Sequence, residues 1–201
     1  MFNLIKEILK KNPKSRKIYK SDSSQTIRVV KEIREYNDEF SETFFMSWMS
    51  TTFIRYVYLS SNHDEKLKHF EEIYLSEKAK KNWAEDLELY DLFKIVTVNN
   101  IDFLDFFHTE KEETMNIRLH VVGKGIKGSE NKEIEEMRIL YYDIELVKQD
   151  SKKISLTNIT ANCPNCGAPT KIATYGICDH CGQMVSIYDN VWKIKNIEMD
   201  M

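Results

Sequence analysis

Hydrophobic residues in the first half of the chain recur at helical spacing. The clearest case spans residues 38–60, where Phe40, Phe44 and Trp48 lie four residues apart. A second apolar row runs beside the first and consists of Phe45, Met49, Phe53, Tyr56 and Val57. So wide an apolar stripe predicts a helix that is enclosed on much of its circumference.

Shorter segments on either side have weaker patterns. Residues 64–82 place Leu67, Phe70, Ile73 and Tyr74 on one face, which predicts a further helix. Residues 27–36 fit a short helix or a strand, and the pattern does not decide between them.

The beginning of the chain is basic. Residues 2–11 predict an amphipathic helix that ends at Asn12-Pro13, and residues 14–26, which are basic and then Ser-rich, indicate a linker. Two interpretations of this segment stay open. It is an anchor for an anionic membrane surface, or a packing helix at a frayed terminus.

The pattern changes to that of β-strands from about residue 89 to residue 160. Candidate strands cover residues 92–107, 115–126, 135–147 and 152–160, where β-branched and aromatic residues are dense. Helices followed by an antiparallel meander predict an α+β fold, with N-terminal helices packed on the sheet.

Composition limits the class of protein. The 201 residues are 42% apolar and 30% charged, as in a soluble globular protein, and the net charge is −3. No stretch approaches the roughly 20 apolar residues that span a bilayer, and no apolar run has the length of a signal peptide. We therefore expect a cytoplasmic protein with three parts: a segment and linker at 1–26, an α+β domain at 27–160, and a ribbon with its tail at 161–201.

The four cysteines form two closely spaced pairs. Cys163 and Cys166 are followed by Gly167, and Cys178 and Cys181 are followed by Gly182. A CxxC turn directs two thiolates to one point, and the glycine admits the backbone conformation that turns amide N–H groups toward the sulfurs. Two such knuckles on a hairpin with a turn at Tyr175-Gly176 predict a tetrahedral four-sulfur site, which suits a structural zinc ion.

Other uses of these cysteines fit the pattern less well. A redox CxxC is one exposed pair with a lowered thiol pKa, usually at a helix start. An iron–sulfur or mononuclear iron centre with four thiolates also satisfies the ligand chemistry. His180, inside the second knuckle, is expected to be an exposed bystander.

The ribbon resembles that of a known family. CPNCGAP, a short hairpin and CDHCG, followed by Tyr188, Asp189 and Trp192, resemble the C-terminal ribbon of bacterial proteins with a Tim-forty-four-like domain. The resemblance implies a cystatin-like cone, as in nuclear transport factor two, with helices in the concave face of a curved antiparallel sheet. It also implies that residues 135–147 and 152–160 are paired closing strands, and it implies no catalytic residue.

Catalysis is not predicted. The candidate acid–base residues are His108, His120, Asp91, Asp102, Asp105 and Asp143, and no nucleophile motif, phosphate loop or carboxylate pair accompanies them. His120 is a cavity base if it faces inward, and otherwise an ordinary solvent-facing strand residue. Asp102 and Asp105 flank an aromatic run and mark a bulge or a strand end.

The leading hypothesis is therefore a non-catalytic adaptor that binds a polypeptide or an apolar ligand through the α+β domain. A nucleic-acid-binding ribbon is one alternative, although Lys171, Lys193 and Lys195 are balanced by nearby acids, Asp179, Asp189, Glu198 and Asp200. Peripheral membrane association through basic residues 2–20 is another. The tail at 191–199 is expected to pack on the main domain or to mediate association.

Overall fold

The computed structural model describes residues 21–38, 40–87, 92–129, 132–149, 159–163, 166–172, 175–182, 184–186 and 192–200. The predicted helix at 2–11, the linker up to residue 20 and most of the predicted strand at 152–160 lie outside these ranges. So do the candidate Asp91 and the tail residues Tyr188 and Asp189.

The undecided segment at 27–36 is a helix. It belongs to α2 (Ser23–Tyr36), whose first four residues overlap the end of the segment predicted as a linker. The reason is the cap: the Asp22 carboxylate accepts hydrogen bonds from the backbone N–H groups of Ser24 and Gln25, at 3.1 and 3.2 Å. A linker extending to residue 26 is therefore wrong.

The long apolar segment forms one helix, as predicted, and the next forms two. The first is α3 (Glu42–Ser61). The single helix predicted at 64–82 is instead α4 (Leu67–Tyr74) and α5 (Glu77–Leu87). The break has a tertiary cause, because Leu75 forms a parallel bridge with Ile194 and the Ser76 N–H donates to the Ile194 carbonyl at 2.9 Å.

The main sheet has four antiparallel strands in the order β1-β2-β3-β8. Three of them match the predicted strands: β1 (Leu92–His108), β2 (Glu112–Ser129) and β3 (Lys132–Gln149). The fourth is β8 (Lys193–Asp200), which pairs with β3 and comes from the tail that we placed with the ribbon. The fourth described strand of this sheet therefore comes from the tail and not from the predicted strand at 152–160, most of which lies outside the described residues, and the tail belongs with the sheet of the α+β domain.

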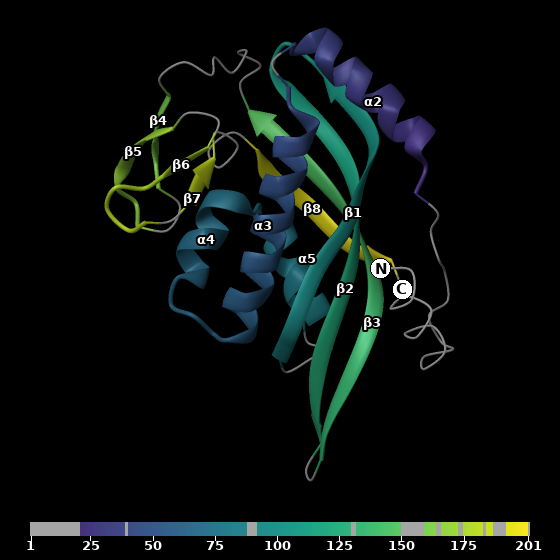
Figure 1. Ribbon diagram of the computed structural model, residues 1–201, viewed down its shortest axis with the longest axis vertical. Coiled ribbons are helices and arrows are strands. Elements are labelled where there is room, and N and C mark those ends of the chain that lie inside the picture. The colour runs from purple at the N-terminus through teal and green to yellow at the C-terminus, as the bar shows by residue number, and fades with distance from the viewer. Residues whose placement is uncertain are drawn as a thin grey trace.

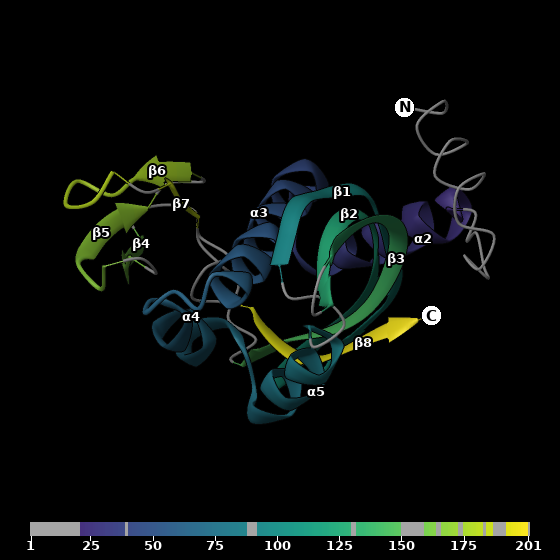
Figure 2. The same cartoon turned by 90° about the horizontal axis from the view of Figure 1, so that it is seen from below.

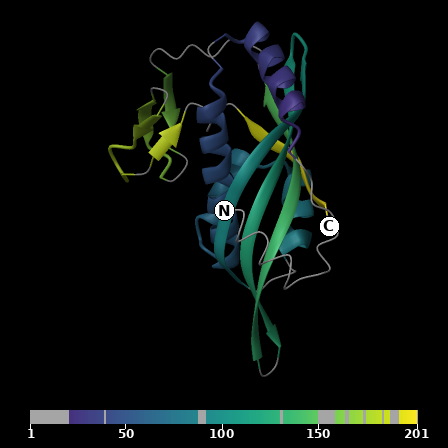
Figure 3. The ribbon, with the colours of Figure 1, turned by 45° about the vertical axis from the view of Figure 1, so that its right-hand side comes forward.

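Helices α3, α4 and α5 pack against one face of the sheet, which curves strongly around α3 (Figures 1 and 2). The Phe45 ring lies 5.5 Å from Phe103 of β1, and Phe53 lies 4.9 Å from Tyr142 of β3, between ring centroids. This arrangement confirms the predicted α+β class with helices on a curved antiparallel sheet. Beyond the helices, β2 and β3 continue as a two-stranded hairpin (Figure 3).

The concave face of the sheet is filled by the protein's own side chains. They come from helices α3, α4 and α5 and from all four strands, β1, β2, β3 and β8, and they belong to one connected core. The large side chains that are fully buried are Phe45, Met49, Phe53, Phe70, Trp83, Phe103, Met115, Ile117, Leu119, Ile144 and Leu146.

Both outer strands are covered in part along their free edges. On β1, the Phe103 N–H donates to Thr26 Oγ1 at 3.2 Å, and Gln25 Nε2 donates to the Leu104 carbonyl at 2.8 Å, so α2 takes the place of a neighbouring strand. On β8, the carbonyls of Ile194 and Lys195 accept from Ser76. Among the helices described, none combines the length and apolarity needed to cross a bilayer.

Candidate functional site

The four cysteines lie in two small hairpins beside α3 and α4 (Figures 1 and 2). The first pairs β4 (Ile159–Asn162) with β5 (Pro169–Ile172), and the second pairs β6 (Tyr175–Ile177) with β7 (Met184–Ser186). Each hairpin encloses one CxxC. The predicted turn at Tyr175-Gly176 is wrong, because both residues pair with β7 as part of β6.

The two knuckles have the same backbone geometry. The Gly167 N–H donates to the Cys163 carbonyl, and the Gly182 N–H donates to the Cys178 carbonyl, both at 2.8 Å. The two glycines have φ angles of 72° and 69°. A side chain strains a backbone in this left-handed region, so glycine is the residue that closes each turn without cost.

The sulfur atoms converge in the way that a single metal ion requires. Cys163 Sγ lies 3.6 Å from Cys181 Sγ, Cys166 Sγ lies 3.7 Å from Cys178 Sγ, and all four lie within 4.8 Å of one another. A tetrahedron with metal–sulfur bonds of about 2.3 Å has sulfurs about 3.8 Å apart. These thiols form no disulfide with one another. The four residues predicted as ligands therefore form a site that can hold a metal ion.

In each knuckle one cysteine is buried and the other is exposed. The first cysteine of each pair, Cys163 or Cys178, is buried and belongs to the same connected cluster of buried residues as the main core. The second, Cys166 or Cys181, is exposed, and so is His180. One side of the site thus faces the protein and the other faces solvent.

Two of the sequence candidates for acid–base chemistry come together elsewhere. His120 Nε2 lies 2.7 Å from Asp102 Oδ2, and the two side chains are 13% and 7% exposed. Neither interpretation of His120 holds. Its neighbours Leu119 and Val121 point into the core, so His120 is on the opposite face of the sheet, yet it is largely shielded from solvent.

Asp102 is the hub of this cluster. Its Oδ1 accepts hydrogen bonds from Ser21 Oγ at 2.5 Å and from Asn100 Nδ2 at 2.7 Å. The serine hydroxyl therefore donates to the carboxylate and not to the imidazole. Sequence analysis missed Ser21 and Asn100. No local signal could have found Ser21, which lies 81 positions before Asp102, whereas Asn100 is only two positions before it on the same strand.

The remaining candidates are dispersed. Asp143 accepts two hydrogen bonds from Arg118, each 2.6 Å long. His108 stacks on Tyr36 with ring centroids 4.2 Å apart. The pairing of β1 with β2 is irregular between Phe103 and Asp105, which agrees with the bulge predicted at Asp105.

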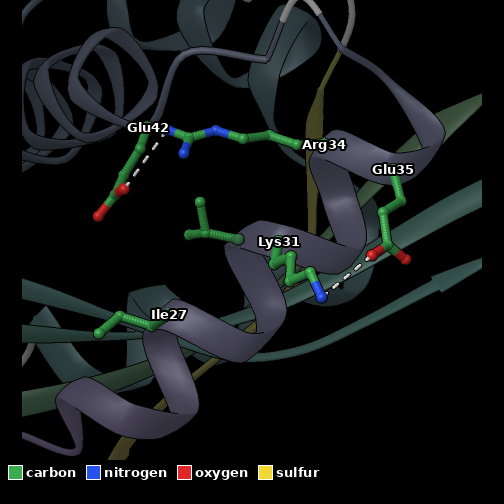
Figure 4. A pocket seen from close by; sticks show the side chains of 6 residues that line it. Ile27, Lys31, Arg34, Glu35 and Glu42 are labelled. Atoms are coloured by element: carbon green, nitrogen blue, oxygen red, sulfur yellow. Dashed lines mark ion pairs between the residues drawn. The ribbon is translucent and has the colours of Figure 1, made fainter.

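A second feature, which the sequence did not indicate, is a hollow of about 410 Å³ between α2 and the start of α3 (Figure 4). Ile27 of α2, which is 68% exposed, supplies accessible apolar surface, whereas Val30 also lines the hollow but is only 3% exposed. Four charged residues complete the lining, namely Lys31, Arg34, Glu35 and Glu42. Figure 4 shows Arg34 of α2 reaching across to Glu42 of α3.

The fold and the site together define an α+β protein that carries, on two short hairpins, a four-thiol site able to hold a metal ion. Comparison of the chain with protein-family models, with curated proteins and with solved structures found no match in any of the three.

Proposed function

We propose that this chain is a non-catalytic adaptor, which binds a polypeptide through the outside of its α+β domain and uses zinc to fold its ribbon. The observation that carries the zinc assignment is the convergence of four sulfurs within 4.8 Å. Soft thiolate ligands in a tetrahedral arrangement favour zinc over harder cations. Four protein ligands also complete the coordination, so the ion has a structural role.

The adaptor assignment is supported by the filled concave face. Phe45, Phe53 and Trp83 are no more than 1% exposed, so the helices already occupy the space that a ligand inside the cone would need. The hollow beside α2 instead opens on the outside of the domain. A binding surface for a partner is therefore better placed on the exterior than inside the sheet.

A non-catalytic role is supported by the hydrogen bonds around His120. Asp102 orients the imidazole, but the nearby hydroxyl of Ser21 donates to the same carboxylate and is not activated by the histidine. Asn100 of the same strand adds a third donor to Asp102, which suits a carboxylate that links β1 to β2 and to the residue before α2. The relationship to Tim-forty-four-like proteins is also a proposal, supported by the ribbon spacing and the order of helices before strands.

Elemental analysis of the purified full chain tests the zinc assignment. We expect one zinc per chain and less than a tenth of that in Cys163→Ser, while His180→Ala, a change in the same ribbon, keeps the full amount. Iron in place of zinc, or an equal loss of metal in the histidine variant, would contradict it.

Selection from a random peptide display library against the zinc-loaded full chain tests the adaptor assignment. We expect enrichment of peptides that bind saturably at one site, measured on synthetic peptides by isothermal titration. If repeated selections yield no peptide with saturable binding, the assignment is wrong.

A further inference from the structure

The charged residues that line the hollow beside α2 form only long, exposed ion pairs with one another. Among the described residues, the ion pair recorded for Arg34 joins its Nη2 to Glu42 Oε2 at 3.8 Å, with side chains 53% and 35% exposed. Lys31 and Glu35 lie 3.5 Å apart and are more exposed still. Ion pairs that are this long and this exposed to solvent contribute little to stability.

Other arginines of this protein show what a well-made pair looks like here. Arg118 binds both oxygens of Asp143 at 2.6 Å, and Arg28 binds Glu32 at 2.8 Å on the same helix as Arg34. Glu42 therefore does not contact the Arg34 guanidinium as closely as Asp143 contacts Arg118, so the N–H donors of Arg34 are poorly used. A guanidinium in this state favours a carboxylate that can bind it through two parallel hydrogen bonds.

Apolar surface lies directly beside this guanidinium. Ile27, Val30 and Arg34 are separated by three and four residues, so they line one face of α2. Figure 4 shows Ile27 at one end of the hollow and the Arg34–Glu42 pair at the other. An exposed isoleucine in a concave setting is a place for an aliphatic group from a partner.

We propose that this hollow binds a polypeptide segment that presents an aliphatic side chain next to a carboxylate, which rests on the adaptor function proposed above. The aliphatic group covers the exposed side chain of Ile27. The carboxylate replaces Glu42 on Arg34 and forms a bidentate pair. Glu42 then acts as an internal competitor that keeps the affinity low.

Because Glu42 competes with the ligand for Arg34, substituting these two residues should change the binding affinity in opposite directions. Arg34→Gln removes the donor and weakens binding by about tenfold or more. Glu42→Gln removes the competitor and strengthens binding several-fold. Arg28→Gln is the matched control, because Arg28 is on the same helix, is paired with Glu32 and does not line the hollow. A general loss of folding cannot produce these opposite effects.

The test is an NMR titration of the zinc-loaded full chain with acetyl-Ala-Leu-Asp-Leu-Ala-amide, compared with the same peptide carrying Asn in place of Asp. We expect amide shifts in α2 and at the start of α3, tighter binding of the Asp peptide, and loss of this preference in Arg34→Gln. Equal affinity for the two peptides, no shifts in these segments, or no strengthening in Glu42→Gln would overturn the proposal. If library-selected peptides bind saturably but shift other segments, this site is wrong while the adaptor function stands.

Discussion

The α+β domain and the ribbon are folded by different forces. The strands β1, β2 and β3 are 17 or 18 residues long and bury a continuous apolar face. The ribbon strands have three or four residues, and among the ribbon side chains whose burial is described, the buried ones are Cys163 and Cys178. Two-stranded hairpins of this size are not stable in water by themselves.

The difference shows how stability is divided within one short chain. The domain obtains its stability from about 25 cal/mol for each Å² of apolar surface removed from water. Among the ribbon side chains whose burial is described, little such surface is buried, so we expect folding of the ribbon to depend on a metal ion held by its four thiols. Variants and conditions that act on one force should therefore leave the other region intact.

Metal removal is the largest expected effect. Structural zinc contributes about 10–16 kcal/mol to the folding of small metal-dependent modules, so a strong chelator should unfold residues 159–186. Hydrogen exchange followed by mass spectrometry should show lost protection there and retained protection in β2 and β3. Simultaneous loss of protection in β2 and β3 would show that the two regions are not energetically separate.

Truncation of Phe53 should destabilise the α+β domain and leave the metal site of the ribbon intact. Its ring is 1% exposed and packs 5.1 Å from Trp83 and 4.9 Å from Tyr142. Phe53→Ala should lower the free energy of unfolding by about 4 kcal/mol in denaturant titrations and leave the metal content unchanged. Tyr58→Ala on the same helix is the control, because Tyr58 is 37% exposed and its loss should cost less than about 1 kcal/mol. Loss of metal in Phe53→Ala would contradict this separation.

A buried ion pair tests whether the α+β domain depends on apolar burial or on buried polar contacts. Lys148 Nζ donates to Glu113 Oε1 at 2.6 Å, and both side chains are 4% exposed. Lys148→Met leaves a buried carboxylate unpaired and should cost about 3 kcal/mol in the same titrations. Adding Glu113→Leu removes that charge and should recover most of the loss. A double variant that is less stable than the single one would show that the pair is strongly stabilising.

The smallest effect concerns the cap of α2. Hydrogen bonds from the Ser24 side chain and the Gln25 backbone hold the pKa of Asp22 below its usual value of 3.8. The charged form therefore stabilises the folded state fully above pH 3.8, and this contribution is lost as the pH falls through the lower folded-state pKa.

Asp22→Asn should therefore melt slightly below the unmodified protein at pH 7, with the difference disappearing as the pH falls from 3.8 through the lower folded-state pKa of Asp22. Circular dichroism melts of both proteins measure it, and the difference between them cancels the loss of metal that both undergo in acid. A difference that stays constant across this range would rule out a contribution from the carboxylate charge.

The metal site could be predicted from sequence because its ligand spacing is local. Each pair spans four residues, and the position after the pair is a glycine with positive φ. The long apolar stripe of α3 was predictable for the same reason. Both features depend on residues within one or two turns of chain.

The strand β8 could not be predicted because a bulge conceals its pattern. The pairing with β3 shifts between Glu145 and Leu146, so Ile194 and Ile197 both point into the core although three positions separate them. That spacing is typical of a helix and not of a strand. The contact between Asp102 and His120 could not be predicted because it depends on the register of two strands: the partner of His120 is Asn100, which places Asp102 diagonally beside His120 on the same face of the sheet.

The position of the ribbon between β3 and β8 has a consequence for protein synthesis. A ribosome that has completed β3 must add residues 150–192 before β8 can begin to emerge, which takes about 2–9 seconds at about 5–20 residues per second. Until then, the backbone groups of Tyr141–Val147 that pair with β8 have no partner in the nascent chain. The knuckles emerge within that interval, so the four thiols of the nascent chain are available to a metal ion before the sheet is complete.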